Sequence, residues 1–155
     1  METEVHHDLV RTAEILGGKK VLQLRVHNRL EAHDLLQKGL PSSVLDHLVR
    51  SVGILGAQSH AGLEKAVGIS IRTLQRHRET PSRRLSPEQS GRTWKFAEIL
   101  AHAIDLFGSL EEAEKWLEQP AMALDQRRPL DLLSTTAGVE SVEELLTRIE
   151  YGVYV

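Results

Sequence analysis

Apolar side chains recur every three or four residues along most of this chain, a spacing that predicts amphipathic α-helices. Glycine and proline end the helical stretches, and serine or asparagine precedes them as a cap. We therefore expect a mainly all-α protein. The expected helices cover 5–16, 29–38, 43–52, 59–67, 70–79, 86–107, 109–119 and 141–150, with one or two helical turns at 129–133.

One stretch departs from helical spacing. Residues 20–26, KVLQLRV, alternate apolar and polar side chains with the period of two that is typical of a half-buried strand. A lone strand leaves its backbone hydrogen-bonding groups without partners. We therefore expect one short strand near residues 20–26, paired with its copy in a second subunit or with another strand of this chain.

Several helix starts carry a capping signal, in which serine or asparagine is followed three residues later by glutamate or glutamine. Ser86 has the strongest signal, because Pro87 and Gln89 both follow it. Either Ser42 or Ser43 is expected to cap the helix after Pro41. The other pairs with this spacing are Asn28 with Glu31, Ser109 with Glu112, and Ser141 with Glu144.

Residues 63–79, LEKAVGISIRTLQRHRE, predict a helix-turn-helix. Gly68 lies where the chain must bend and where a Cβ is costly. Ser70 can cap the second helix by accepting a hydrogen bond from a free backbone N–H. The apolar positions that would pack the two helices together are Leu63, Val67, Ile69 and Leu74.

The outward face of the second helix carries side chains that reach base edges and phosphates in a DNA major groove. The candidate DNA contacts are Ser70, Arg72, Thr73, Gln75, Arg76 and Arg78, and the basic loop at 80–84 adds Arg83 and Arg84 as phosphate contacts. A helical hairpin with no DNA-binding role and an ordinary surface loop would fit the same spacing.

The composition narrows the class of protein. A chain of 155 residues can form two small domains, and we expect a DNA-binding domain over 1–85 and a helical domain over 86–155. The chain has no cysteine, which excludes disulfides and thiolate metal sites. No apolar run approaches the ~20 residues of a membrane span, and the N-terminus lacks a signal-peptide pattern. We therefore expect a cytoplasmic protein with no membrane partner.

Charge is distributed unevenly along the chain, although the net charge is only −3. Residues 50–97 carry nine Lys/Arg against three Asp/Glu, whereas residues 98–155 carry four against twelve. The basic block contains the predicted helix-turn-helix, where phosphate contacts need positive charge. The acidic block calls for a different kind of partner.

Nothing in the sequence indicates catalysis. The eight histidines are scattered, and none belongs to an HExxH-like arrangement. The chain has no glycine-rich phosphate loop and no nucleophile elbow. Asp131 and the C-terminal glutamates are more simply caps and solvated side chains than paired catalytic carboxylates. We therefore expect neither an enzyme nor a bound cofactor.

The chain ends in YGVYV, residues 151–155, directly after the last predicted helix. Exposing two tyrosines and two valines is costly unless a partner covers them. Tyrosine is a common interface anchor. An edge strand or a tail packed on its own domain would fit the same residues. Trp94, Phe107 and Trp116, in contrast, are expected in the core.

From Trp94 to the C-terminus the pattern resembles the toxin-binding domain of Xre/MbcA/ParS-type antitoxins, and Gly39-Leu40-Pro41 with the helix-turn-helix resembles their DNA-binding half. The matching residues are Trp94, Leu106-Phe107-Gly108, Ala113, Trp116-Leu117, Pro120, Ala123-Leu124, Pro129-Leu130-Asp131-Leu132-Leu133, Thr135, Gly138, Val142 and Ile149-Glu150-Tyr151-Gly152. One departure is Asp125-Gln126, where the family commonly has two glycines.

The resemblance implies an inhibitor and autorepressor rather than a catalyst. Such antitoxins usually pair with a RES-domain toxin, an enzyme that destroys NAD, and the C-terminal end of the antitoxin blocks entry to the toxin's active site. By position, the blocking segment would comprise Glu150, Tyr151, Gly152, Val153, Tyr154 and Val155. The expected partners are therefore a cognate RES-domain toxin and operator DNA.

Two further expectations concern assembly and the alternative function. One helix-turn-helix makes too little contact for tight specific binding, so we expect a homodimer. The alternative function is a transcription regulator whose C-terminal domain senses a ligand or partner and binds no toxin. A buried small-molecule cavity within residues 98–150 would favour that alternative.

Overall fold

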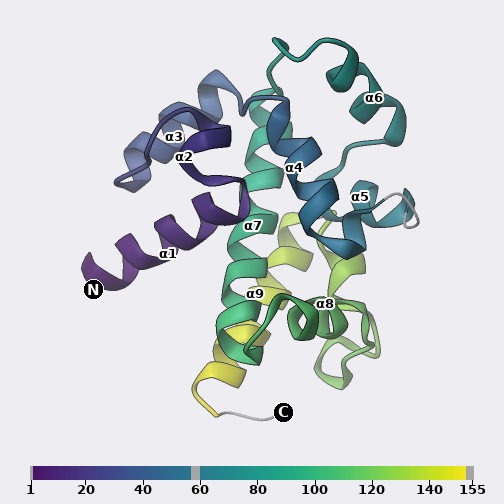
Figure 1. Ribbon diagram of the computed structural model, residues 1–155. Helices are drawn as coiled ribbons and strands as arrows, with labels where there is room; N and C mark the ends of the chain where they lie inside the picture. The colour runs from purple at the N-terminus through teal and green to yellow at the C-terminus, as the bar shows by residue number, and fades with distance from the viewer. Residues whose placement is uncertain (1, 57–59, 153–155) are drawn as a thin grey trace.

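The computed structural model describes residues 2–56 and 60–152, and within these ranges the chain is almost entirely helical (Figure 1). Two isolated bridges, Pro41 with Arg84 and Ala121 with Arg127, are the only β pairing in this part of the chain. The elements are α1 (Glu2–Ile15), α2 (Gly18–Leu22), α3 (Arg29–Lys38), α4 (Ser43–Ser51), η1 (Gly53–Leu55), α5 (His60–Val67), α6 (Ile71–Glu79), α7 (Pro87–Phe107), α8 (Leu110–Glu118), η2 (Met122–Leu124), η3 (Pro129–Leu132) and α9 (Thr136–Glu150). The predicted all-α class is confirmed.

Helix α7 is the central element, and elements from both ends of the chain pack against it (Figure 1). Its start confirms the predicted capping box: Ser86 Oγ accepts from Gln89 N, Gln89 Oε1 accepts from Ser86 N, and Pro87 occupies the first turn. Gly108 ends the helix in a left-handed conformation, φ 96°. Helices α1, α3 and α5 contact α7 from the N-terminal half, and α8 and α9 contact it from the C-terminal half.

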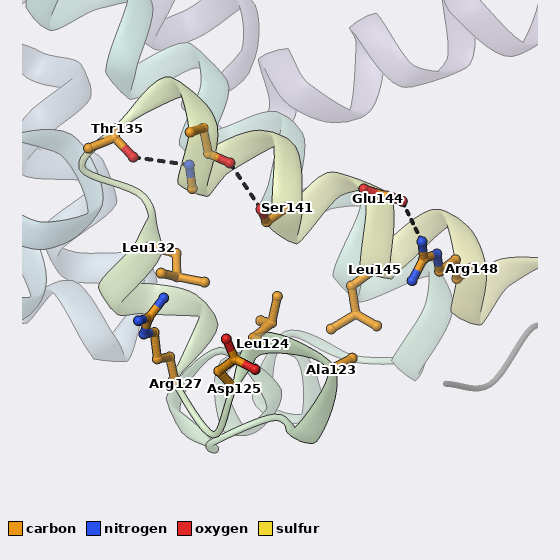
Figure 2. Close-up of a pocket in the computed structure, with 12 residues that line it drawn as sticks. Ala123, Leu124, Asp125, Arg127, Leu132, Thr135, Ser141, Glu144, Leu145 and Arg148 are labelled. Atoms are coloured by element: carbon orange, nitrogen blue, oxygen red, sulfur yellow. Dashed lines mark hydrogen bonds and ion pairs between the residues drawn. The ribbon is translucent and has the colours of Figure 1, made fainter.

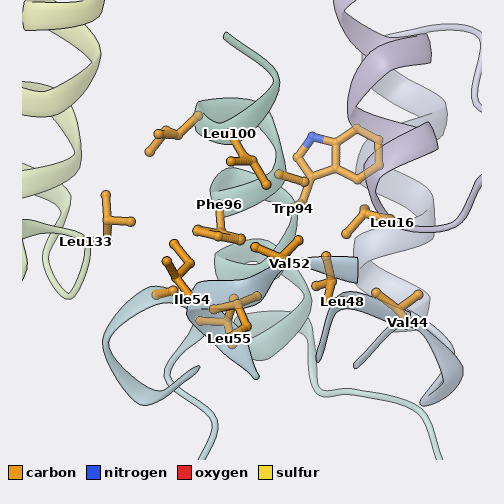
Figure 3. Close-up of a cluster of buried hydrophobic side chains, with 14 of the residues drawn as sticks. Leu16, Val44, Leu48, Val52, Ile54, Leu55, Trp94, Phe96, Leu100 and Leu133 are labelled. Carbon is orange, nitrogen blue, oxygen red and sulfur yellow. The ribbon is translucent and has the colours of Figure 1, made fainter. Parts of the chain in front are cut away.

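One hydrophobic core runs through the molecule and includes residues from both halves (Figure 3). Phe96 and Leu100 on α7 are fully buried between Leu55 of the N-terminal half and Leu133 of the C-terminal half. Trp94 is buried as predicted, whereas Phe107 and Trp116 are half-buried, with ring centroids 5.3 Å apart. The two halves therefore share a core, and the division at residue 85 stays a prediction.

The predicted strand at residues 20–26 is wrong. Residues 18–22 form the short helix α2, and Gln23 ends it in a left-handed conformation, with its N–H donating to the Lys19 carbonyl. The alternation did identify the buried side chains, because Leu22 and Val26 are buried while Gln23 and Arg25 are exposed. No neighbouring strand is available within the described residues, so backbone groups are satisfied locally by a helical turn.

The predicted start of the last helix is also wrong. Thr135, not Ser141, caps α9, and its Oγ1 accepts from Gly138 N at 3.0 Å. Ser141 lies inside the helix, where its hydroxyl donates to the Ala137 carbonyl. At Gly138 a Cβ would lie 1.9 Å from the Leu132 carbonyl oxygen, so this early start requires glycine.

Two of the other predicted caps differ in detail. Asn28 Oδ1 accepts from Glu31 N, but the Glu31 carboxylate accepts from His27 N rather than completing a capping box. Ser42 precedes α4, yet its side chain makes no cap. The Ser109 cap of α8 is confirmed, with Glu112 N donating to Ser109 Oγ at 3.1 Å.

Candidate DNA-binding and partner-binding surfaces

Helices α5 and α6 form the predicted helix-turn-helix. Leu63, Val67, Ile69 and Leu74 are all buried, as the pattern required. Gly68 bends the chain with φ +71°, a left-handed conformation that suits glycine. The turn therefore places α6 at the edge of the molecule, with one face against α4 and the other directed to solvent (Figure 1).

The first residues of α6 hold the helix start together. Ser70 Oγ accepts a hydrogen bond from Thr73 N at 3.2 Å and donates to Thr73 Oγ1 at 3.1 Å. Both residues are half-buried. The side chains of Ser70 and Thr73 thus stabilise the end of α6 from which any base contacts would be made.

Three of the candidate DNA contacts are exposed on the outer face of α6, namely Arg72, Gln75 and Arg76. Arg78 is also exposed, but its Nε donates to Asp46 Oδ1 on α4 at 2.8 Å. Asp46 also pairs with Arg50, at 2.7 Å. The first three side chains form the free basic face of α6, while Arg78 ties α6 to α4.

The basic loop after α6 presents its two arginines differently. Arg83 is exposed. Arg84 is half-buried, and its Nη1 donates to the Gly39 carbonyl at 2.6 Å. The backbone of Leu85 also donates to the Leu40 carbonyl at 2.9 Å. Arg84 therefore fixes the loop to residues 39–41, and Arg83 is the better placed of the two for a phosphate contact.

A buried polar cluster beneath α6 was missed by sequence reasoning. Ser42 Oγ donates to the Arg83 carbonyl and lies 2.6 Å from His77 Nδ1. His77 is only 4% exposed, and burial together with the nearby Arg83 charge lowers its pKa. The cluster joins α4, α6 and the basic loop. The helical spacing of His77 from Leu74 places it on the buried face of α6.

At the other end of the molecule, the last turn of α9 is tied to α7. Glu150 Oε2 lies 3.1 Å from His102 Nε2. Tyr151 follows with 76% of its surface exposed, and Gly152 has φ +71°. Of the predicted toxin-binding residues, Val153, Tyr154 and Val155 lie outside the described residues.

A groove of about 400 Å³ lies between α9 and the loop that follows η2 (Figure 2). Leu124, Leu132 and Leu145 form its floor, and Arg127 and Arg148 stand at its sides. Asp125 and Gln126 have φ values of 54° and 62°. These two residues therefore hold left-handed conformations of the kind that glycine favours, so the loop keeps a glycine-like backbone despite the departure in sequence.

The structure shows no group of three or more metal-ligating side chains in its described residues. It also shows there no helix that is long and apolar enough to cross a membrane.

Comparison with known protein families matches the two halves separately. Residues 31–98 match the antitoxin Xre-like helix-turn-helix domain, and residues 102–152 match the antitoxin Xre/MbcA/ParS C-terminal toxin-binding domain. The boundary between the two matches falls within α7.

Curated proteins with the name antitoxin Xre align over most of the chain. One from Yersinia enterocolitica is 34% identical over 122 residues, covering 78% of this chain and 79% of the relative. One from Photorhabdus laumondii is 29% identical over 120 residues, covering 77% and 78%. One from Pseudomonas putida is 34% identical over 86 residues, covering 54% and 52%. With a helix-turn-helix and a helical C-terminal unit in place, this chain belongs to the family of Xre antitoxins.

Proposed function

We propose that this protein neutralises a RES-type, NAD-degrading toxin and represses its own operon. The C-terminal segment, residues 150–155, blocks the toxin's active site, and α6 with the basic loop binds operator DNA as part of a homodimer. As a member of the Xre antitoxin family, the protein is a DNA-binding regulator of a toxin–antitoxin system and not an enzyme.

The observation that carries the toxin-blocking proposal is the placement of Tyr151. Its ring is 76% exposed one residue after a helix whose last turn is held to α7 through Glu150 and His102. A side chain on a rigid base loses little conformational freedom when it inserts into a pocket, so more of its contact energy appears as affinity. Tyrosine at such a position is a typical interface anchor.

DNA binding is supported by the exposed side chains of Arg72, Gln75 and Arg76 on one face of α6. Arginine recognises guanine, and glutamine recognises adenine, through paired hydrogen bonds in the major groove. Arg83 adds positive charge at the end of the loop, where phosphate contacts would set the position of the helix on DNA.

The toxin-blocking proposal is tested by coexpression with the protein encoded by the adjacent gene, while growth and cellular NAD are measured. We expect that protein alone to deplete NAD and stop growth, and the full-length antitoxin to prevent both. Deletion of residues 151–155 is expected to abolish protection while leaving the melting temperature and DNA binding unchanged.

Substitution of Tyr151 gives a finer test. Tyr151→Ala is expected to weaken toxin affinity by about 2 kcal/mol, the scale of an interface hot spot. Leu30→Ala is the matched control, because Leu30 is equally exposed, at 76%, but lies on α3. A truncated protein that melts normally and still protects cells refutes the blocking segment. An adjacent gene product that leaves NAD and growth unchanged favours the ligand-sensing regulator instead.

A further inference from the structure

The helix-turn-helix is joined to the C-terminal unit by two separate polar contacts. The first is an ion pair in which Lys65 Nζ on α5 donates to Asp131 Oδ1 on η3 at 2.7 Å. Arg128 holds the same carboxylate from the other side, with Nε and Nη2 each 2.9 Å from its oxygens. Hydrogen bonds from Arg128 and from Lys65 keep the pKa of Asp131 well below its usual range, so the carboxylate is charged at neutral pH.

The second contact is made by Arg92, which projects from α7. Its Nη2 donates to the Lys65 carbonyl at 3.1 Å and to the Leu133 carbonyl at 3.4 Å. The Lys65 carbonyl belongs to the last turn of α5, where helix carbonyls lack partners within the helix and a cation is favoured. One guanidinium therefore bridges the end of α5 and the end of η3.

Arg92 also contacts the turn of the helix-turn-helix. A Cβ built on Gly68 would lie 2.0 Å from Arg92 Nη1, so the guanidinium fills the space that a side chain at the turn would occupy. Gly68 thus has two reasons to be glycine, its positive φ and the close approach of Arg92. Because α6 follows this turn directly, the contact bears on the direction of α6.

We propose that Arg92 and Asp131, which lie outside the helix-turn-helix, are positioning residues for DNA binding. They hold the C-terminal end of α5 and its turn in the orientation that directs α6 toward DNA. This inference rests on the proposed DNA-binding role of α6. It assigns to Asp131, part of the toxin-binding domain by sequence match, a contact with the DNA-binding half.

The physical consequence is a cost of ordering. If the contacts with α5 are removed, α5 and α6 sample more orientations in the free protein, and binding to DNA must restrict them again. Affinity then falls even though no group that touches DNA has changed. Simple electrostatics predicts the opposite for Asp131, because removing a negative charge should strengthen attraction to phosphate. The two explanations therefore differ in sign.

The test uses the full chain and a duplex taken from the region upstream of its own gene. Asp131→Asn is compared with Glu112→Gln, which likewise removes one negative charge from an exposed ion pair, with Lys115 on α8. We expect Asp131→Asn to weaken DNA binding on the order of fivefold, the upper range for an exposed ion pair. Glu112→Gln is expected to leave affinity unchanged or slightly increased. Hydrogen exchange of the α5 and α6 amides is expected to accelerate only in Asp131→Asn.

Two results overturn the inference. One is Asp131→Asn protein that binds DNA as tightly as Glu112→Gln protein, and the other is unchanged hydrogen exchange in α5 and α6. Failure of the proposed function gives a different pattern, in which the unmodified protein shows no salt-dependent binding to the duplex. In that case the exchange measurement still decides whether Asp131 holds α5.

Discussion

Substitution of Gly68 by alanine provides a direct measure of how tightly the turn of the helix-turn-helix is packed. Gly68 has φ +71°, and alanine in a left-handed conformation costs about 1–2 kcal/mol. The new Cβ would also lie 2.0 Å from Arg92 Nη1, so the guanidinium would have to leave its position.

The magnitude follows from the hydrogen bonds that the displaced Arg92 could no longer make. Hydrogen bonds to charged groups contribute about 1.5–3 kcal/mol each. Of the two that Arg92 makes, the one to the Leu133 carbonyl is long at 3.4 Å, so we count one full bond. The free energy of unfolding is therefore expected to fall by about 3–5 kcal/mol in total, a large part of the roughly 5–15 kcal/mol that stabilises a typical domain.

Gly108 supplies the matched control. It too has positive φ, +96°, but a Cβ there would have no neighbour within 4 Å. Gly108→Ala should therefore cost only the backbone strain, about 1–2 kcal/mol. Urea unfolding followed by circular dichroism measures both values, provided that the slope with urea concentration is unchanged.

A double-mutant cycle isolates the role of Arg92. In an Arg92→Met background the added methyl displaces no guanidinium, so Gly68→Ala should cost no more than the Gly108 control. Equal losses of stability for Gly68→Ala and Gly108→Ala in the unmodified protein would refute the packing argument.

The remaining predictions concern DNA binding, pH and assembly. Arg72→Ala with Arg76→Ala is expected to weaken operator binding and to lower the salt slope by about one for each phosphate that the variant no longer neutralises; an unchanged slope in a folded variant would remove α6 from the interface. His77 is buried and its pKa is lowered, so below its ordinary value of about 6.5 the unfolded chain binds the proton more readily than the folded one. Stability should therefore fall as the pH drops from about 7 toward 5, and His77→Gln should flatten this part of the urea-midpoint curve. Sedimentation at micromolar concentration should show a homodimer; a monomer both free and on DNA would contradict it.

Local signals in the sequence predicted the helix-turn-helix and the central helix correctly. Gly68 at the turn, the Ser70 cap and the Ser86 capping box each depend on residues within a few positions of one another. Such interactions form wherever the local chain is placed, so they can be read without knowledge of the fold.

Local signals failed where a competing partner was available. Ser42 precedes a helix as a cap would, yet its hydroxyl donates to the Arg83 carbonyl, 41 residues away. Ser141 carries a capping signal, but Thr135 caps the helix one and a half turns earlier, because Gly138 permits close approach to Leu132. The alternating stretch at 20–26 buries the expected side chains without forming a strand, since no strand partner is present in the described part of the chain.

The sequence by itself determined where most helices begin and end, which face of α6 carries the arginines, and the resemblance to an antitoxin family. Only the tertiary structure decided which arginines remain free and how the two halves are joined. Arg78 and Arg84 look equivalent to Arg76 and Arg83 in the sequence, but Asp46 and the Gly39 carbonyl engage them. Lys65 and Asp131 lie 66 residues apart, and no local pattern pairs them. A charged side chain takes the partner that the packed core brings within reach, and that choice is made only when the whole chain has folded.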